Sequence, residues 1–78
     1  MPDGIKNFGV ILFHTNSAAF RAEKMLGKKG MQAKLIPTPR EFSSDCGIAL
    51  RFNWDHAAHV RELLESASVE FSSMHPFA

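Results

Sequence analysis

The sequence has few cysteines, little net charge and no long hydrophobic run. One of its 78 residues is a cysteine, Cys46, so no intramolecular disulfide can form and nothing suggests a disulfide-stabilised exported fold. No apolar run approaches the roughly 18 residues that cross a membrane. The N-terminal residues also lack the pattern of a secretory signal. We therefore expect a cytoplasmic protein without a membrane partner.

Charge and motifs narrow the function classes further. Nine Lys and Arg residues against eight Asp and Glu residues give a formal net charge of +1, which makes nucleic acid an unlikely class of partner. The chain contains no Gly-rich phosphate loop and no CxxC pair. Nucleotide chemistry and dithiol redox chemistry therefore have no support from the sequence, and we expect no cofactor.

The alternation of apolar and polar residues predicts six elements. Gly30 should end the first helix, Asp55 should cap the second, and Pro37 should end a strand at the edge of the sheet. Residues 74–78 read as a tail. Strands are predicted over 8–13, 31–36, 48–52 and 69–71, and helices over 17–28 and 55–66.

This order predicts an α+β, ferredoxin-like split β-α-β sandwich (βαββαβ). A four-stranded antiparallel sheet should carry both helices on one face, within one domain over 1–78 whose core spans about 7–73. We expect Ile11, Phe13 and Ala49 on the open face, covered by the tail or by a second molecule. A homodimer is therefore possible, and Phe20, outside the apolar stripe of the first helix, is either a harmless surface residue or a partner contact.

Cys46 lies in a polar run between two apolar segments, where a turn should bring its sulfur near solvent. A buried cysteine is usually an inert packing residue, so packing at the start of the third strand is the plain alternative. Arg40 could favour the thiolate, whereas Asp45 would oppose it. Gly47 permits a left-handed backbone or the close approach of another molecule, while Ser43 and Ser44 are turn formers.

The four histidines suggest a metal site only weakly. His56 and His59 are three residues apart on the second predicted helix, but no carboxylate or cysteine stands at a supporting spacing. We therefore predict no metal. His14 or His75 could serve as the base of a thiol enzyme, although spacing alone does not pair either with Cys46.

The stretch Pro37-Thr38-Pro39-Arg40, followed by Ser43-Ser44-Asp45-Cys46-Gly47, resembles the selenium/sulfur (Se/S) carrier protein-like family of small bacterial domains. The family pattern is approximately Pro-x-Pro-Arg and then Ser-Ser-x-Cys-Gly. The resemblance extends over nearly the whole chain. It implies a cytoplasmic carrier that holds sulfur or selenium on Cys46 and exchanges it with donor and acceptor proteins. Its binding loop would comprise Pro37, Pro39, Ser43, Ser44 and Gly47. Arg40 also matches the pattern, and from its charge and its place in the loop we predict that it stabilises the thiolate.

Three functional classes remain open at this point. The favoured one is a non-catalytic carrier of a persulfide or perselenide on Cys46. The second is a ligand-sensing or protein-interaction module in which the cysteine is incidental. The third is a thiol enzyme that uses His14 or His75.

Overall fold

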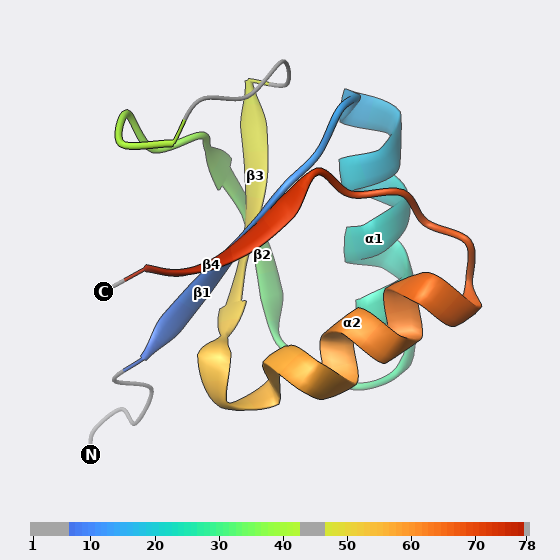
Figure 1. Cartoon of the computed structure of the whole chain (residues 1–78). Helices are drawn as coiled ribbons and strands as arrows, with labels where there is room; N and C mark the ends of the chain where they lie inside the picture. The colour runs from blue at the N-terminus through green and yellow to red at the C-terminus, as the bar shows by residue number, and fades with distance from the viewer. Residues whose placement is uncertain (1–6, 43–46, 78) are drawn as a thin grey trace.

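A computed structural model describes residues 7–42 and 47–77, which form a four-stranded antiparallel sheet and two α-helices (Figure 1). The strand order is β2 (Ala33–Pro37), β3 (Ile48–Asn53), β1 (Phe8–Leu12) and β4 (Ser73–Phe77), so β1 and β3 lie in the centre and β2 at an edge. The ferredoxin-like prediction is confirmed. In chain order the elements are β1 (Phe8–Leu12), α1 (Asn16–Lys28), β2 (Ala33–Pro37), β3 (Ile48–Asn53), a 3-10 turn (Trp54–His56), α2 (Ala57–Ser66) and β4 (Ser73–Phe77).

The main core lies between the sheet and the two helices, which cover the same face of the sheet (Figure 1). The central strand β1 is buried at four of its five positions, as its unbroken apolar run predicts. Both helices bury one apolar stripe and leave their charged residues outside. The fully buried side chains of this core include Ile11, Phe13, Leu26, Leu50, Val60 and Leu64.

The predicted orientation of β1 is wrong. Ile11 and Phe13 face the helices, because Ile11 pairs directly with Leu50 and opposite residues of an antiparallel pair share a face. Val10 and Leu12 occupy the open face instead. Because every residue from 8 to 13 except Gly9 is large and apolar, the run itself contains no alternation that could reveal this choice.

The open face has its own small cluster. Val10, Leu12 and Ala49 are buried there beneath three partly buried side chains, Ile36, Phe42 and Phe77. One of these, Phe77, comes from the predicted tail. The described chain therefore already covers the centre of this face, so the face no longer argues for a second molecule. A homodimer stays an untested prediction.

The first helix begins and ends close to the predicted residues. Thr15 is its N-cap, and the Thr15 hydroxyl accepts a hydrogen bond from the Ala18 N–H at 3.1 Å. Gly30 follows the helix with a φ of 76°. The Gly30 N–H donates to the Gly27 carbonyl and the Met31 N–H to the Leu26 carbonyl, which is the pattern of a Schellman motif.

The second helix starts differently from the prediction. Asp55 is not its N-cap, because a 3-10 turn precedes α2 and Asn53 caps that turn. The Asn53 side-chain oxygen accepts a hydrogen bond from the Asp55 N–H at 3.0 Å. His56 stands at the N-cap of α2 without a side-chain hydrogen bond. An aspartate and an asparagine are both good caps, so the two candidates cannot be separated by residue type.

The predicted strand over 69–71 is also wrong. Val69 instead closes the end of α2: its N–H donates to the Leu64 carbonyl at 2.9 Å, and Ser68 between them has a φ of 57°. The last strand is β4, Ser73–Phe77, in the segment predicted to be a tail. This strand contains Pro76, and β4 is an edge strand, where a residue without an N–H is tolerated.

Candidate functional site

The candidate site is the connection between β2 and β3, which contains the cysteine. Pro37, the last residue of β2, pairs with Ile48, the first of β3, so the connection begins and ends at one end of the sheet. The predicted site residues Ser43, Ser44 and Cys46, together with Asp45, lie outside the described residues. The described residues on either side of them, 37–42 and Gly47, form the part of the site with known geometry.

Two backbone hydrogen bonds shape the described part of this connection. The Thr38 N–H donates to the Gly47 carbonyl at 3.1 Å, which continues the hairpin one step beyond the sheet. The Phe42 N–H donates to the Pro39 carbonyl at 3.0 Å and closes a turn over Arg40 and Glu41.

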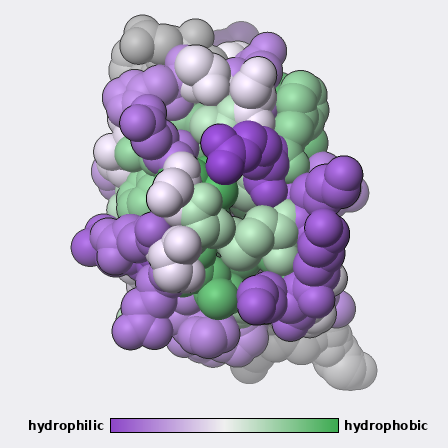
Figure 2. Space-filling view, turned by 90° about the vertical axis from the view of Figure 1, so that its right-hand side faces the viewer, coloured by the Kyte–Doolittle hydropathy of each residue, from purple (hydrophilic) through white to green (hydrophobic). Residues whose placement is uncertain are grey.

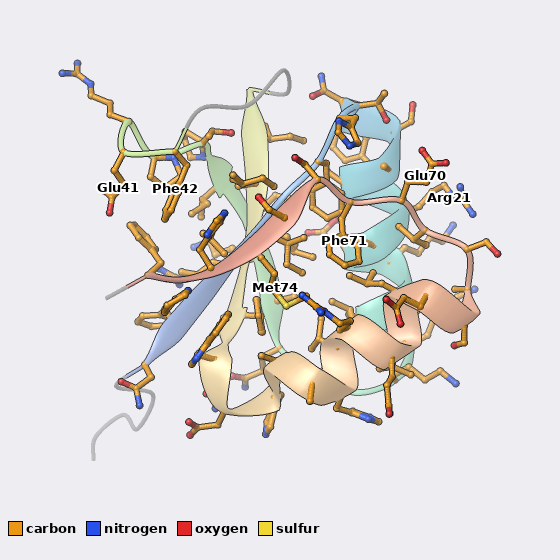
Figure 3. All side chains as sticks on the ribbon, in the orientation of Figure 1. Arg21, Glu41, Phe42, Glu70, Phe71 and Met74 are labelled. Carbon is orange, nitrogen blue, oxygen red and sulfur yellow. The ribbon has the colours of Figure 1, made fainter. Side chains whose placement is uncertain are left out.

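Phe42 fixes the first arm of the connection to the sheet. Its ring stacks on His75 of β4 with centroids 4.9 Å apart and meets Phe77 edge-on at 6.1 Å. In Figure 3 Phe42 lies on the side of the sheet opposite the helices, whereas Phe71 and Met74 lie between sheet and helices. The chain therefore enters the segment 43–46 directly from an aromatic anchor on the open face.

Arg40 and Gly47 are described, and each bears on a prediction. Arg40 is exposed within the turn, and its proposed contact with Cys46 stays a prediction. The φ of Gly47 depends on the carbonyl carbon of Cys46, which lies outside the described residues, so the left-handed backbone predicted for Gly47 stays a prediction. A Cβ added at Gly47 would meet no described atom within 4 Å. The close approach of another molecule, the alternative predicted role of this glycine, stays a prediction as well.

The histidines do not form a metal site in the described part of the chain. No group of three potential ligands occurs among residues 7–42 and 47–77, and both His56 and His59 are exposed. The Nε2 atom of His75 lies 2.8 Å from the Ser73 hydroxyl, and its ring is stacked on Phe42. His14 is exposed just after β1. His75 is thus already engaged by two neighbours, which does not favour it as a free base.

The comparison with protein families identifies the group to which this fold and this loop belong. The model of the family described as "Putative Se/S carrier protein-like" matches residues 8–76. The chain belongs to this family. The matched range includes every helix and strand except the last residue of β4, and it includes the whole connection from Pro37 to Gly47. Comparisons with curated proteins and with solved structures gave no match.

The membership fits the rest of the described structure. In residues 7–42 and 47–77, neither α-helix has the length and apolar character needed to cross a membrane. Membership in an Se/S carrier-like family also implies, in general terms, interaction with sulfur- or selenium-transfer partners.

Sequence reasoning missed the aromatic anchor of the Se/S carrier-like loop. Phe42 is the only aromatic residue in the polar run from Pro39 to Gly47, and that isolation was the available signal. A large apolar side chain in such a run has to be covered by something. Its partners His75 and Phe77 could not be identified because their segment was predicted to be a tail.

Proposed function

We propose that this protein carries sulfur or selenium as a persulfide or perselenide on Cys46 and passes it to a partner protein. The observation that carries the proposal is the family match over residues 8–76, which includes the chain's only cysteine. The anchored approach to the loop supports it. A carrier must present one atom to two partners in turn, and Phe42 and the Thr38–Gly47 hydrogen bond fix both ends of the segment that holds Cys46.

The transfer step is a displacement without net oxidation. The Cys46 thiolate attacks the outer sulfur of a donor persulfide, and a new S–S bond forms on Cys46. The donor's own S–S bond breaks, and its electron pair leaves with the inner sulfur as a thiolate. Discharge to an acceptor thiolate repeats this exchange in the opposite sense. Because the chain has a single cysteine, no internal thiol can displace the cargo by closing a disulfide.

We expect the wild-type protein to gain the mass of one sulfur after incubation with a cysteine desulfurase and cysteine. With a perselenide donor, whose outer selenium is displaced onto Cys46 in the same way, it should gain the mass of one selenium, and a reducing thiol should remove either. Cys46→Ser should gain neither, because a hydroxyl is not deprotonated at neutral pH. Intact-protein mass spectrometry measures the gain, and circular dichroism checks that the variant is folded. An equal gain in Cys46→Ser, or none in the wild type, would contradict the carrier function.

Arg40 is assigned the role of stabilising the thiolate. An ordinary thiol has a pKa of about 8.5 and is mostly protonated at neutral pH, so a nearby cation increases the reactive fraction. We expect Arg40→Ala to slow alkylation of Cys46 by iodoacetamide at pH 7 about two- to threefold, the size typical of a charge interaction through solvent.

The matched control for Arg40 is Arg61→Ala, which removes an exposed arginine from α2. Its alkylation rate should equal that of the wild type. Raising the salt concentration to about 1 M should remove the difference between Arg40→Ala and the wild type, because salt screens exposed charges. An Arg40→Ala rate that matches the wild type at low salt would refute the assignment.

A further inference from the structure

The outer side of α1 carries three cations beside an apolar hollow. Arg21, Lys24 and Lys28 recur at helical spacing on the side away from the buried stripe. They line a hollow of about 240 Å³ together with Met25, Ala67 and Val69. Figure 2 views the molecule from this side and shows hydrophobic residues at the floor of a depression with hydrophilic residues around it.

The three cations that line the hollow leave an excess of positive charge on this side even when Glu70 is counted with them. Glu70, on the segment that follows α2, is drawn beside Arg21 in Figure 3. Within α1 itself Glu23 is the single acidic residue against three basic ones, Arg21, Lys24 and Lys28, and a fourth, Lys29, follows at the C-cap. The surface therefore favours an acidic ligand.

The residue types at two further positions of α1 are not explained by packing within the described chain. Phe20 is 53% exposed and is the only large hydrophobic side chain so exposed among the described residues. Gly27 lies inside the helix, where glycine is less stable than alanine. A Cβ added at Gly27 would meet nothing within 4 Å, and its φ is not left-handed. Neither packing nor backbone conformation within the described chain requires this glycine.

We propose that the outer face of α1, formed by Phe20, Arg21, Lys24, Gly27 and Lys28, docks an acidic amphipathic helix of a partner protein. The cations meet acidic side chains of that helix. Gly27 lets the two backbones approach closely, because a glycine presents no side chain at the contact.

The hydrophobic contacts fit the same occupant. Phe20 packs against the partner on one flank, and the hollow beside Met25 receives an apolar side chain on the other. At about 240 Å³ this hollow is smaller than the roughly 300–1,000 Å³ typical of small-molecule sites, so a side chain suits it better than a cofactor. A second copy offering the same face would place like charges together. The docking proposal rests on the proposed function only for the identity of the partner, which would be a donor or an acceptor of sulfur or selenium. The docking contact itself does not use Cys46.

The probe is an isolated helical peptide of about 20 residues, capped at both ends, with leucine along one face and glutamate beside it. We titrate it into the full-length, ¹⁵N-labelled protein and follow amide chemical shifts. The expected result is that residues 20–28 and 67–69 shift and that a matched peptide with lysine in place of glutamate causes no shift. Equal binding of the two peptides, or shifts confined to the open face of the sheet, would overturn the proposal.

Charge variants test the cations. Lys24→Gln with Lys28→Gln should weaken binding of the acidic peptide about five- to tenfold at low salt. The matched control is Lys34→Gln with Arg61→Gln, which removes the same charge from exposed positions elsewhere. This control should stay within about twofold of the wild type. Equal weakening by the two double variants would mean that only net charge matters and would overturn the assigned surface.

Gly27→Ala separates docking from stability because its two expected effects have opposite signs. Alanine should raise the unfolding midpoint, since it is the better helix former and its methyl group meets no described atom. The same methyl group should weaken peptide binding about fivefold or more by preventing close approach. A variant that is stabilised and binds the peptide as the wild type does would overturn the role of Gly27.

Three further measurements test other ligands for this surface and separate docking from the carrier function. Phosphatidylserine vesicles and a single-stranded oligonucleotide should bind more weakly than the acidic peptide, and sedimentation should show no self-association that depends on Lys24. Either competitor binding more tightly at residues 20–28, or such self-association, would overturn the proposal. Cys46→Ser should bind the peptide like the wild type, because docking does not use the cysteine. A wild-type protein that binds the peptide but gains no sulfur would therefore contradict the carrier function and leave the docking surface supported.

Discussion

Replacing Gly9 by alanine is expected to lower the free energy of unfolding by about 1–3 kcal/mol, the usual cost of overfilling a packed core. Gly9 lies in the central strand β1 on the face toward the helices, opposite Phe52 of β3. An added Cβ would stand 2.5 Å from a ring atom of Trp54 and 2.7 Å from one of Phe52. These two rings pack against each other with centroids 6.0 Å apart, so neither can move without disturbing the other.

Urea unfolding followed by the fluorescence of Trp54, the only tryptophan of the chain, measures this cost. Gly47→Ala is the matched control, because an added Cβ there meets no described atom. We expect that control to change the free energy of unfolding by less than about 0.5 kcal/mol. Equal effects of the two substitutions would mean that β1 does not present Gly9 to the helix layer.

Much of the fold could be predicted because the pattern of elements leaves few topologies. A strand-helix-strand-strand-helix-strand order with right-handed crossovers puts β1 and β3 in the centre, and the structure has this order. The orientation of β1 could not be predicted, because a strand buried on both faces shows no alternation. It follows instead from the pairing of Ile11 with Leu50, which is a property of the register between two distant segments.

The end of the chain shows a second limit. Val69 and Phe71 alternate with a glutamate as strand residues do, yet Val69 is the hydrophobic residue that closes the Schellman motif of α2. Ser68 takes the left-handed position where glycine is usual, so the ordinary sequence signal of a helix end is missing. The local alternation of residues 69–71 thus favoured a strand there, whereas tertiary packing places the last strand at Ser73–Phe77.

The candidate site was predictable as a segment but not as a surface. The family pattern marks residues 37–47 in the sequence, and the family match includes all of them. The contact of Phe42 with His75 brings together residues more than thirty positions apart and depends on β4 lying beside β1. No local sequence pattern contains that information, so the contact of Phe42 could be identified only once the strand order of the sheet was known.

Phe42→Ala is expected to lower the free energy of unfolding by about 2 kcal/mol. A fully buried phenylalanine costs about 3–5 kcal/mol on truncation, and Phe42 is only partly buried. Its two aromatic contacts, with His75 and Phe77, each contribute about 0.5–1.5 kcal/mol beyond burial. The loss also uncovers the cluster around Val10 on the open face. Urea unfolding measures the change.

Phe20→Ala is the matched control, since it removes the same side chain from a position that is 53% exposed and replaces it with a better helix former. We expect no loss of stability there. If Phe42 also guides the segment that holds Cys46, Phe42→Ala should slow persulfide loading by the desulfurase under conditions where the variant remains folded. A variant as stable as the wild type would contradict the anchor itself. Normal persulfide loading in a destabilised but folded variant would limit Phe42 to stabilising the fold. Loading would then require Cys46 but not the contact of Phe42 with the sheet.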